Sequence, residues 1–196
     1  MSGFLKGKVL EQLDQKYHSY LEEKIGFVES VVGRMVPVMT AEQRKEDPLL
    51  VVVEPYKHLP IAAGMIKGKF PNVPGIELAD NFQSFVDRKL YAHNAGHACA
   101  AYLGSLKEYE YIYQVMNDPE IKTLVRTAMQ ETGKALVKKH QLDPVAHNEH
   151  IEDLLSRFGN VALGDQVSRV GRDPIRKLGP DDRLVGGAKL CLEYEV

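Results

Sequence analysis

Several residues with reactive side chains lie close together in the segment RKLYAHNAGHACAAYLG, residues 88–104. In an α-helix, Lys89, His93 and His97 would follow one another about 40° apart around the axis. Asn94 would lie about 60° from His97, so all four side chains would project from one broad face. An uncharged lysine can accept a proton, and an amide and an imidazole can hold a carbonyl or alkoxide oxygen. This combination suits the removal of a proton from an alcohol without a metal ion.

Lys89 would need a lowered pKa for this role. The neighbouring Arg88 and removal from water would both favour the uncharged amine, whose ordinary pKa is about 10.4. Gly96 costs a helix about 1 kcal/mol relative to alanine, which indicates close packing or ligand binding at that position. Spacing alone leaves another interpretation open, in which Lys89 is a surface lysine and Asn94 and His97 are hydrogen-bonded core residues.

Other motifs carry weaker signals. GMIKGKF, residues 64–70, has the wrong spacing for a phosphate-binding loop and no hydroxyl residue after Lys69. His93 and His97 have the spacing of a metal pair, but no glutamate stands between them and no third ligand is evident, so we expect no metal. The chain contains no GxGxxG and therefore no dinucleotide fingerprint of its own.

The composition is that of an ordinary globular protein, with 44% hydrophobic residues, 27% charged residues and a net charge of -2. No basic excess would attract nucleic acid or a membrane surface, and no apolar run reaches the roughly 20 residues of a membrane span. The N-terminus has no signal-peptide core. Cys99 and Cys191 are the only cysteines, and we expect free thiols and a cytoplasmic location.

The elements that position the reactive residues are predicted to be mostly helices. Apolar residues recur at helical spacing over residues 4–25, which predicts one amphipathic helix. A long helix from Asp80, a possible N-cap, to about residue 103 would carry the reactive face. Pro119 and Pro144 stand at the starts of two more helices, and short helices follow towards the C-terminus.

Strands are expected only in the first 75 residues. LLVVVEPY, residues 49–56, is β-rich and continuously apolar, and we predict a strand buried on both faces. The polar segment 40–48 and the Pro/Gly-rich segment 68–75 are predicted loops. A lone strand without a sheet, and a chain that stops in an apolar run, suggest a piece of a longer polypeptide.

The segment 88–104 resembles the signature helix of the polyol-specific long-chain dehydrogenases, whose pattern is Lys, four residues, Asn, two residues, His. Lys89, Asn94 and His97 match it position for position. The resemblance covers essentially the whole chain, through the segments GFVESVVGRMVP, DPLLVVVEPY and PNVPGIELADNF. The segment SRVGRDPIRKLGPDDRLVGGA is especially similar to the mannitol-1-phosphate 5-dehydrogenases of that family.

The resemblance implies a mainly α fold, with a helical C-terminal domain similar to those of the 6-phosphogluconate dehydrogenases. Residues 1–75 would be the terminal part of a Rossmann domain, a short α/β remnant, with the inter-domain segment. Residues 76–196 would be the helical substrate-binding and catalytic domain, truncated at its C-terminus. The implied cofactor is NAD, bound mainly by the missing part of the Rossmann domain in cis. The other implied partner is a sugar phosphate or polyol, and we expect a monomer.

The family also implies roles for individual residues. Lys89 would take the hydroxyl proton, and Asn94 and His97 would position the reacting oxygen. Arg172 matches the arginine of the family's Arg-x-Pro segment, which contacts the polyol. Charge and proximity in the sequence add three candidate phosphate partners, which are Arg176, Lys177 and Arg183.

Two positions depart from the family pattern. An asparagine usually stands where this chain has Glu29, and it supplies an oxyanion donor, whereas an ionised carboxylate only accepts hydrogen bonds. Loss of one such donor typically costs about a hundredfold in rate. An aspartate usually stands at Gly33. Either the activity is reduced, or Glu29 belongs to a variant proton relay.

The predicted reaction is the NAD-dependent interconversion of mannitol 1-phosphate and fructose 6-phosphate, with the present fragment inactive alone. Mannitol 2-dehydrogenases, arabitol dehydrogenases and hexuronate reductases share the signature helix and are alternatives within the family. A helical binding module that has lost catalysis is an alternative of another class, which Glu29 would suit.

Overall fold

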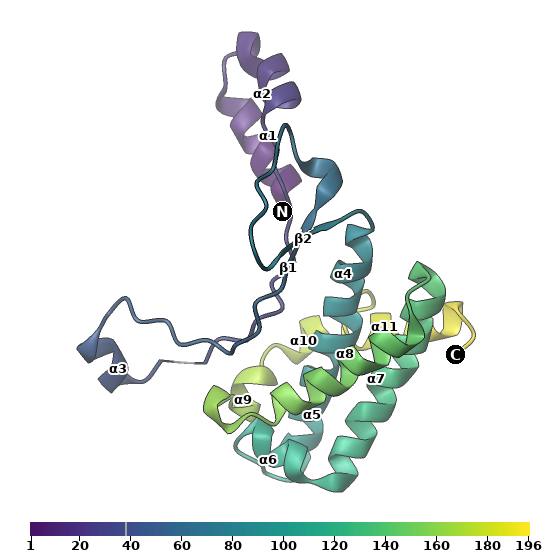
Figure 1. Ribbon diagram of the computed structural model, residues 1–196. Coiled ribbons are helices and arrows are strands. Elements are labelled where there is room, and N and C mark those ends of the chain that lie inside the picture. The colour runs from purple at the N-terminus through teal and green to yellow at the C-terminus, as the bar shows by residue number, and fades with distance from the viewer. Residues whose placement is uncertain (38) are drawn as a thin grey trace. The chain divides into compact units, whose positions relative to one another are not determined.

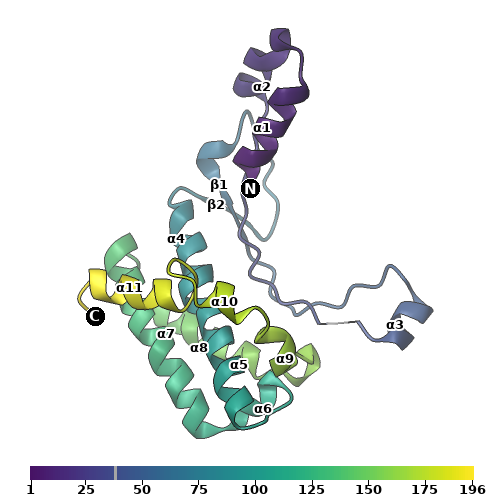
Figure 2. The same ribbon diagram turned by 180° about the vertical axis from the view of Figure 1, so that it is seen from behind.

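The structure is a computed structural model that describes residues 1–37 and 39–196. Packing divides the chain into two compact units, of which the first comprises residues 1–34 and 55–86. The second comprises residues 35–54 and 87–196. Apart from two short strands, the regular elements of the described residues are helices (Figures 1 and 2). The predicted mainly α fold with a small α/β part is confirmed.

The first unit contains a pair of parallel strands, β1 (Leu59–Ala62) and β2 (Ile76–Ala79), joined by register pairs from Leu59–Ile76 to Ala62–Ala79. The prediction that strands lie only in the first 75 residues holds for β1 and is wrong for β2, which begins at Ile76. The loop predicted between them, residues 68–75, is confirmed.

The single helix predicted over residues 4–25 is wrong. The chain forms α1 (Ser2–Gln12) and α2 (His18–Lys24) instead. The break arises at Asp14, whose carboxylate accepts a hydrogen bond from the backbone N–H of Lys16 at 3.1 Å and starts a short 3-10 turn. A local side-chain bond of this kind competes with continued helix.

Two predictions for residues 40–56 are also wrong. Residues 49–56 form no strand, and Leu49 is 86% exposed. An apolar, β-branched run becomes a strand only where a ladder partner is available. The predicted loop 40–48 contains α3 (Ala41–Glu46), because Thr40 and Gln43 cap its N-terminus reciprocally.

The second unit is a helical bundle. Its two longest helices, α7 (Pro119–His140) and α8 (Pro144–Phe158), begin at the predicted prolines and are capped by Asp118 and Asp143. The helix that carries the reactive segment runs from α4 (Phe82–Arg88), which straddles the division between the units, into α5 (Ala95–Leu106). The remaining helices are α6 (Ile112–Asn117), α9 (Val167–Val170), α10 (Pro174–Lys177) and α11 (Val185–Glu193).

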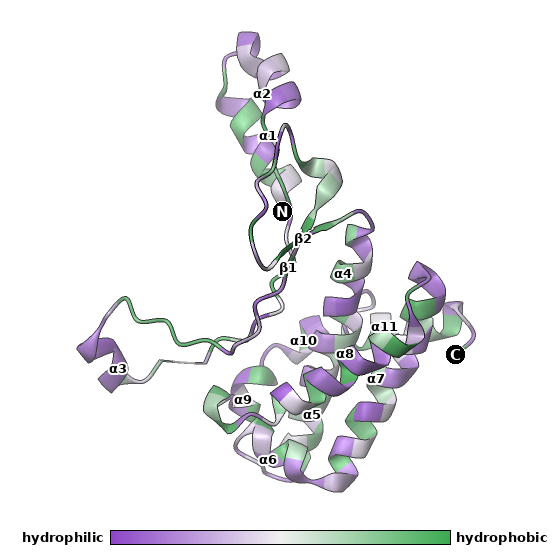
Figure 3. Ribbon diagram, in the orientation of Figure 1, coloured by the Kyte–Doolittle hydropathy of each residue, from purple (hydrophilic) through white to green (hydrophobic). Residues whose placement is uncertain are grey.

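The core of the bundle lies where α5, α7 and α8 come together, and these helices lie side by side in both ribbon views. Hydrophobic and hydrophilic residues alternate along α7 and α8, as expected of helices with one buried face (Figure 3). Ile112, Met129, Leu155 and Phe158 are among the largest buried side chains. Within the described residues, none of the helices is long and apolar enough to cross a membrane.

Glycine permits the close packing of α5. A Cβ on Gly96 would clash with the side chain of Met129 on α7, and a Cβ on Gly104 would clash with Val115 on α6. The packing reason predicted for Gly96 is therefore a neighbouring helix.

Candidate functional site

The reactive segment is not α-helical throughout. Residues Lys89–Asn94 form a π-helix between α4 and α5, and the N–H of Ala95 donates to the carbonyl of Leu90, five residues earlier. Such π-helical turns within α-helices occur frequently at functional sites. The predicted face changes little, because Lys89 and His93 still meet across one turn.

Lys89 is the centre of this cluster. Its Nζ lies 3.0 Å from Nε2 of His93. Burial lowers the pKa of Lys89 to about 8, with the positive charges of Arg157 and Arg183 acting in the same direction and the carboxylate of Glu54 opposing them. These charges come from distant segments. Of the two causes expected from the sequence, removal from water is the largest, and Arg157 and Arg183 stand where Arg88 was expected.

His93 and His97 are held by one aromatic ring. The ring of Phe158 contacts His93 edge to face at 5.6 Å and stacks on His97 at 4.8 Å. Burial lowers the pKa of His93 well below its ordinary value and that of His97 to about 3, and the charge of Lys89 adds to both shifts. Both imidazoles are therefore neutral at pH 7, so each offers one donor and one acceptor nitrogen.

His97 also approaches a carboxylate. Its Nε2 lies 3.2 Å from Oδ2 of Asp165, but the geometry is not that of a hydrogen bond. Asp165 is buried and forms an ion pair with Arg169, and its backbone carbonyl accepts a bond from Ile112 at 2.8 Å. Nε2 of His97 is therefore a buried atom that has no hydrogen-bond partner among the described residues.

A buried ion pair that the sequence did not suggest lies beside Lys89. Nε of Arg157 donates to Oε2 of Glu54 at 2.9 Å, and Glu54 also accepts the N–H of Met35 at 2.6 Å. Burial alone would raise the pKa of Glu54, but the hydrogen bonds from Arg157 and Met35 and the charge of Lys89 lower it overall. The only sequence signal was a lone carboxylate at the end of the apolar run VVV.

Asn94 is half-buried, and within residues 1–37 and 39–196 its side-chain amide has no hydrogen-bond partner. Its donor and acceptor are therefore available to a ligand. In the same part of the chain, no cluster of three His, Cys, Asp or Glu side chains has the arrangement of a metal site.

Arg172 and Arg176 are exposed around α10. Nε of Arg172 donates to the carbonyl of Arg169 at 3.3 Å. Arg176 pairs with two carboxylates, those of Asp173 and Asp182, the second at 3.3 Å. Any anion that binds Arg176 would have to compete with them.

Lys177 and Arg183 act on the reactive cluster. The buried Lys177 donates from Nζ to the carbonyl of Val170, and Nε of Arg183 donates to Asp182 at 2.8 Å. After burial and Lys89, the charges of these two residues are among the causes that lower the pKa of His97. The structure thus brings both cations within electrostatic range of the reactive face.

Glu29 and Gly33 lie in the first unit. The carboxylate of Glu29 accepts bonds from the Met1 ammonium at 2.8 Å and from the N–H and Oγ of Ser2 at 3.1 and 2.8 Å. These hydrogen bonds lower its pKa to about 2, so it is ionised. At Gly33, a Cβ would come within 3.3 Å of the Tyr56 ring.

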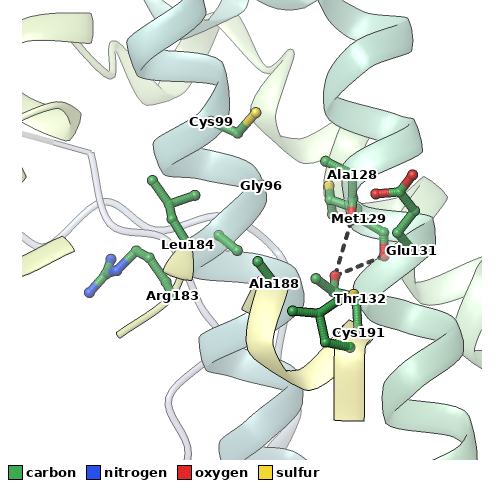
Figure 4. A pocket seen from close by; sticks show the side chains of 12 residues that line it. Gly96, Cys99, Ala128, Met129, Glu131, Thr132, Arg183, Leu184, Ala188 and Cys191 are labelled. Carbon is green, nitrogen blue, oxygen red and sulfur yellow. Dashed lines mark hydrogen bonds between the residues drawn. The ribbon is translucent and has the colours of Figure 1, made fainter. Parts of the chain in front are cut away.

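A cavity of about 360 Å³ lies between α5, α7 and α11 (Figure 4). It is mostly apolar, and Cys99 and Cys191, both free thiols as predicted, line it with Thr132. Arg183 is also part of the lining, but its guanidinium points away from the Thr132 side. Lys89, Asn94 and His97 do not line this cavity.

The second unit is thus a helical domain with a partly buried lysine–histidine cluster, and the first is a small α/β unit with a parallel strand pair. The family model "Mannitol dehydrogenase C-terminal domain" matches residues 81–196, and "Mannitol dehydrogenase Rossmann domain" matches residues 1–75. The chain belongs to the mannitol dehydrogenase family, which confirms the predicted family.

Two solved structures share the fold. A D-sorbitol dehydrogenase in substrate-free form matches 95% of this chain with a TM-score of 0.75 and 20% identity. The mannitol 2-dehydrogenase of Pseudomonas fluorescens, in a ternary complex with NAD and D-mannitol, matches 92% with a TM-score of 0.62 and 24% identity. The chain spans 40% of the length of each.

Proposed function

We propose that the protein is an NAD-dependent dehydrogenase that interconverts mannitol 1-phosphate and fructose 6-phosphate. The observation that carries this proposal is Lys89, a half-buried amine whose pKa is lowered to about 8, on the same helical face as His97. Two dehydrogenases of polyols with the same fold, one bound to NAD and D-mannitol, support the class of reaction.

The sequence of this chain lacks the usual fingerprint of an NAD site. No two of its glycines are separated by a single residue, so the glycine-rich turn of a dinucleotide site is missing from the sequence. We therefore propose that NAD is bound by other residues of the Rossmann domain, and we assign no step to it. The steps below belong to the side chains of the second unit.

Lys89 acts as the proton acceptor for the substrate hydroxyl. Its amine is uncharged above pH 8 and can take the proton at Nζ. In the reverse direction the ammonium returns the proton to the carbonyl oxygen. A pKa near the working pH is what a general base requires, because the group must change its protonation state in each cycle.

Asn94 and His97 hold the reacting oxygen. The amide of Asn94 is without a partner in the described chain, and Nε2 of His97 makes no hydrogen bond within it. Both can donate to an oxygen that becomes negative as its proton leaves, which favours the alkoxide.

Arg183 and Lys177 are the first choice for the substrate phosphate, with Arg172 on the polyol and Arg176 as a further phosphate partner. The charge of Arg183 contributes to the lowered pKa of both Lys89 and His97. Since Arg183 and Arg176 both pair with Asp182, the phosphate must replace that carboxylate. Arginine is well suited to such an exchange, because its guanidinium binds either group through two parallel bonds.

The test compares NADH formation with mannitol 1-phosphate and with mannitol, using the full polypeptide as encoded. Activity on the phosphate ester alone is the expected result. Equal or better activity on mannitol or arabitol would instead support one of the alternative substrates within the family. Lys89→Ala should abolish turnover and leave the thermal unfolding cooperative, and near-normal turnover in this variant would refute the assignment.

A substitution at Glu29 distinguishes an impaired enzyme from a binding module that has lost catalysis. The family's asparagine can donate to the reacting oxygen and an ionised carboxylate cannot, so Glu29→Asn should raise kcat if the enzyme is impaired. Binding of sugar phosphate without turnover, unchanged by Glu29→Asn, would support the non-catalytic module. A monomeric state and a cytoplasmic location stay predictions from the sequence.

A further inference from the structure

We propose that His93 is a positioning residue for Lys89. Its Nε2 accepts a hydrogen bond from the lysine amine and so directs the amine lone pair towards the substrate hydroxyl. This inference rests on the proposed role of Lys89 as the proton acceptor. It adds a residue to the site that the signature pattern of lysine, asparagine and histidine does not contain.

The geometry supports a fixed contact. Nζ of Lys89 lies 3.0 Å from Nε2 of His93, a normal hydrogen-bond distance. His93 is only 4% exposed, and the ring of Phe158 packs against it at 5.6 Å. The π-helix carries both residues on consecutive turns, so the backbone itself sets their separation. The contact thus restrains the flexible side chain of Lys89 against the packed ring of His93.

The direction of the hydrogen bond follows from the chemistry of an amine. An uncharged amine has two N–H donors and one lone pair, and only the lone pair can take a proton. If His93 donated from Nε2, it would occupy that lone pair and block Lys89 as a base. If Nε2 accepts, one N–H of Lys89 is satisfied and the lone pair remains available to the substrate.

His93 is suited to accept, because burial and nearby positive charge keep it neutral. Its pKa lies well below the ordinary value through burial first and then the charges of Lys89, His97, Arg157 and His150. After proton transfer, the same bond stabilises the Lys89 ammonium.

The groups that face the pair come from several elements. The carboxylate of Glu54 raises the pKa of Lys89, while Arg157 of α8 and Arg183 before α11 lower it. On α8, removal from water and then the charge of Arg88 lower the pKa of the half-buried His150 to about 3, and the charge of Lys89 adds a smaller part. These charges stay in place when His93 is replaced, so a change in the pKa of Lys89 would report the lost hydrogen bond.

The first measurement is the pKa of Lys89, read from competitive acetylation over a pH series with mass spectrometry of the Lys89 peptide. It needs no turnover. His93→Leu removes the acceptor, and the pKa should fall by about one unit, since hydrogen bonds to charged groups stabilise them by that order. His93→Gln offers an amide oxygen in its place and should restore most of the shift.

The matched control is His147→Leu. His147 is as buried as His93 and lies on α8, but it packs on Gly133 and has no hydrogen bond to Lys89. Its replacement should leave the pKa of Lys89 unchanged. If His93→Leu does not fold, His93→Met replaces it, because methionine adapts to irregular core sites.

The second measurement is the pH profile of polyol-phosphate oxidation. His93→Leu should lower kcat about tenfold, leave KM nearly unchanged and move the half-maximal pH downwards, and His93→Gln should recover both. A His93→Leu variant whose Lys89 still titrates near 8, or equal losses in the leucine and glutamine variants, would overturn the proposal. An ordinary pKa of about 10.4 for Lys89 in the unmodified protein would instead refute the proposed function.

Discussion

The imidazole of His97 lies parallel to the ring of Phe158, with centroids 4.8 Å apart and planes inclined by 7°. Phe158 is the last residue of α8 and is 2% exposed, so its own position is set by the core. The same ring contacts His93 edge to face. One core aromatic residue thus determines the orientation of two histidines on the reactive face, which couples the packing of α8 to the chemistry proposed for α5.

Phe158→Leu should therefore impair catalysis more than stability. We expect the free energy of unfolding to fall by about 1–2 kcal/mol, less than the 3–5 kcal/mol typical of truncation to alanine. The loss of the stacked ring should lower kcat at least tenfold, because His97 would no longer be fixed against the reacting oxygen. Urea unfolding and steady-state kinetics measure the two effects.

Ile112→Val in α6 is the control for Phe158→Leu. It removes one methyl group from a fully buried side chain and should cost about 0.5–1.5 kcal/mol. If this variant loses as much activity as Phe158→Leu, reduced stability rather than histidine orientation explains the loss.

The lowered pKa of Lys89 predicts a dependence of stability on pH. Between pH 8 and 10.5 the unfolded chain holds a proton on this amine that the folded chain has released. Stability therefore rises with pH across this window, and the full penalty is present below pH 8. The shift corresponds to a few kcal/mol, and we expect about 2 kcal/mol after allowance for partial exposure.

Lys89→Met isolates this contribution. The difference in free energy of unfolding between the unmodified protein and the variant should change by about 2 kcal/mol from pH 8 to 10.5, in favour of the unmodified protein at high pH. Chemical denaturation at several pH values measures it. A difference that stays constant over this range would show that Lys89 titrates normally in the folded protein.

How much of this site was predictable from the sequence depends on how local each contact is. Lys89, His93 and His97 share a helical face because their spacing is close to whole turns, and the structure keeps that face. The helix starts at Pro119 and Pro144 were equally predictable, since proline at the first helical position is a local signal. The π-helix was not, because it depends on how the surrounding helices pack.

The contacts that shift the pKa of Lys89 were not predictable from the sequence for the same reason. Glu54 and Arg157 are 103 residues apart in the chain. The run before Glu54 was interpreted as a buried strand, whereas Val51 is 65% exposed and Glu54 itself is the buried residue. The periodicity of apolar residues cannot distinguish a strand that pairs in a sheet from an unpaired segment that ends in a buried carboxylate.

Glu54→Gln tests the electrostatic role of that carboxylate. The change removes the shorter of the two carboxylate pairs of Arg157 and leaves Asp153, 3.3 Å away, so the cost should stay below the roughly 3–5 kcal/mol of a broken buried pair. Because the carboxylate raises the pKa of Lys89, its loss should move the rising limb of the pH profile below 8. Urea unfolding and the pH dependence of kcat are the measurements.

The control for Glu54→Gln is Glu152→Gln. Glu152 makes a similar bidentate pair with Arg126, at 2.8 and 3.0 Å, but its two side chains are more exposed, at 34% for Arg126 and 43% for Glu152. Glu152→Gln should lower the free energy of unfolding by about 1 kcal/mol or less and leave the pH dependence of kcat unchanged. A Glu54→Gln variant that behaves in the same way would contradict the proposed influence on Lys89.

The two tightly packed glycines of α5 should respond differently to alanine. Each substitution gains about 1 kcal/mol of helix propensity, so the sign of the result depends on the neighbour. At Gly96 the new methyl group meets the flexible side chain of Met129, which can move aside in part. At Gly104 it meets the β-branched and fully buried Val115, which has one preferred rotamer in its helix. We expect Gly104→Ala to lower the free energy of unfolding by about 2–3 kcal/mol and Gly96→Ala by about 1 kcal/mol or less.

Val115→Ala should partly rescue Gly104→Ala, because it removes the methyl groups that the added Cβ would strike. A double-mutant cycle measured by urea unfolding gives this coupling directly. Additive costs in the cycle would mean that α5 and α6 do not meet at these two residues. Since α5 carries Asn94 at its N-cap and His97 in its first turn, a displaced α5 should also lower kcat, and the rescue should restore both quantities together.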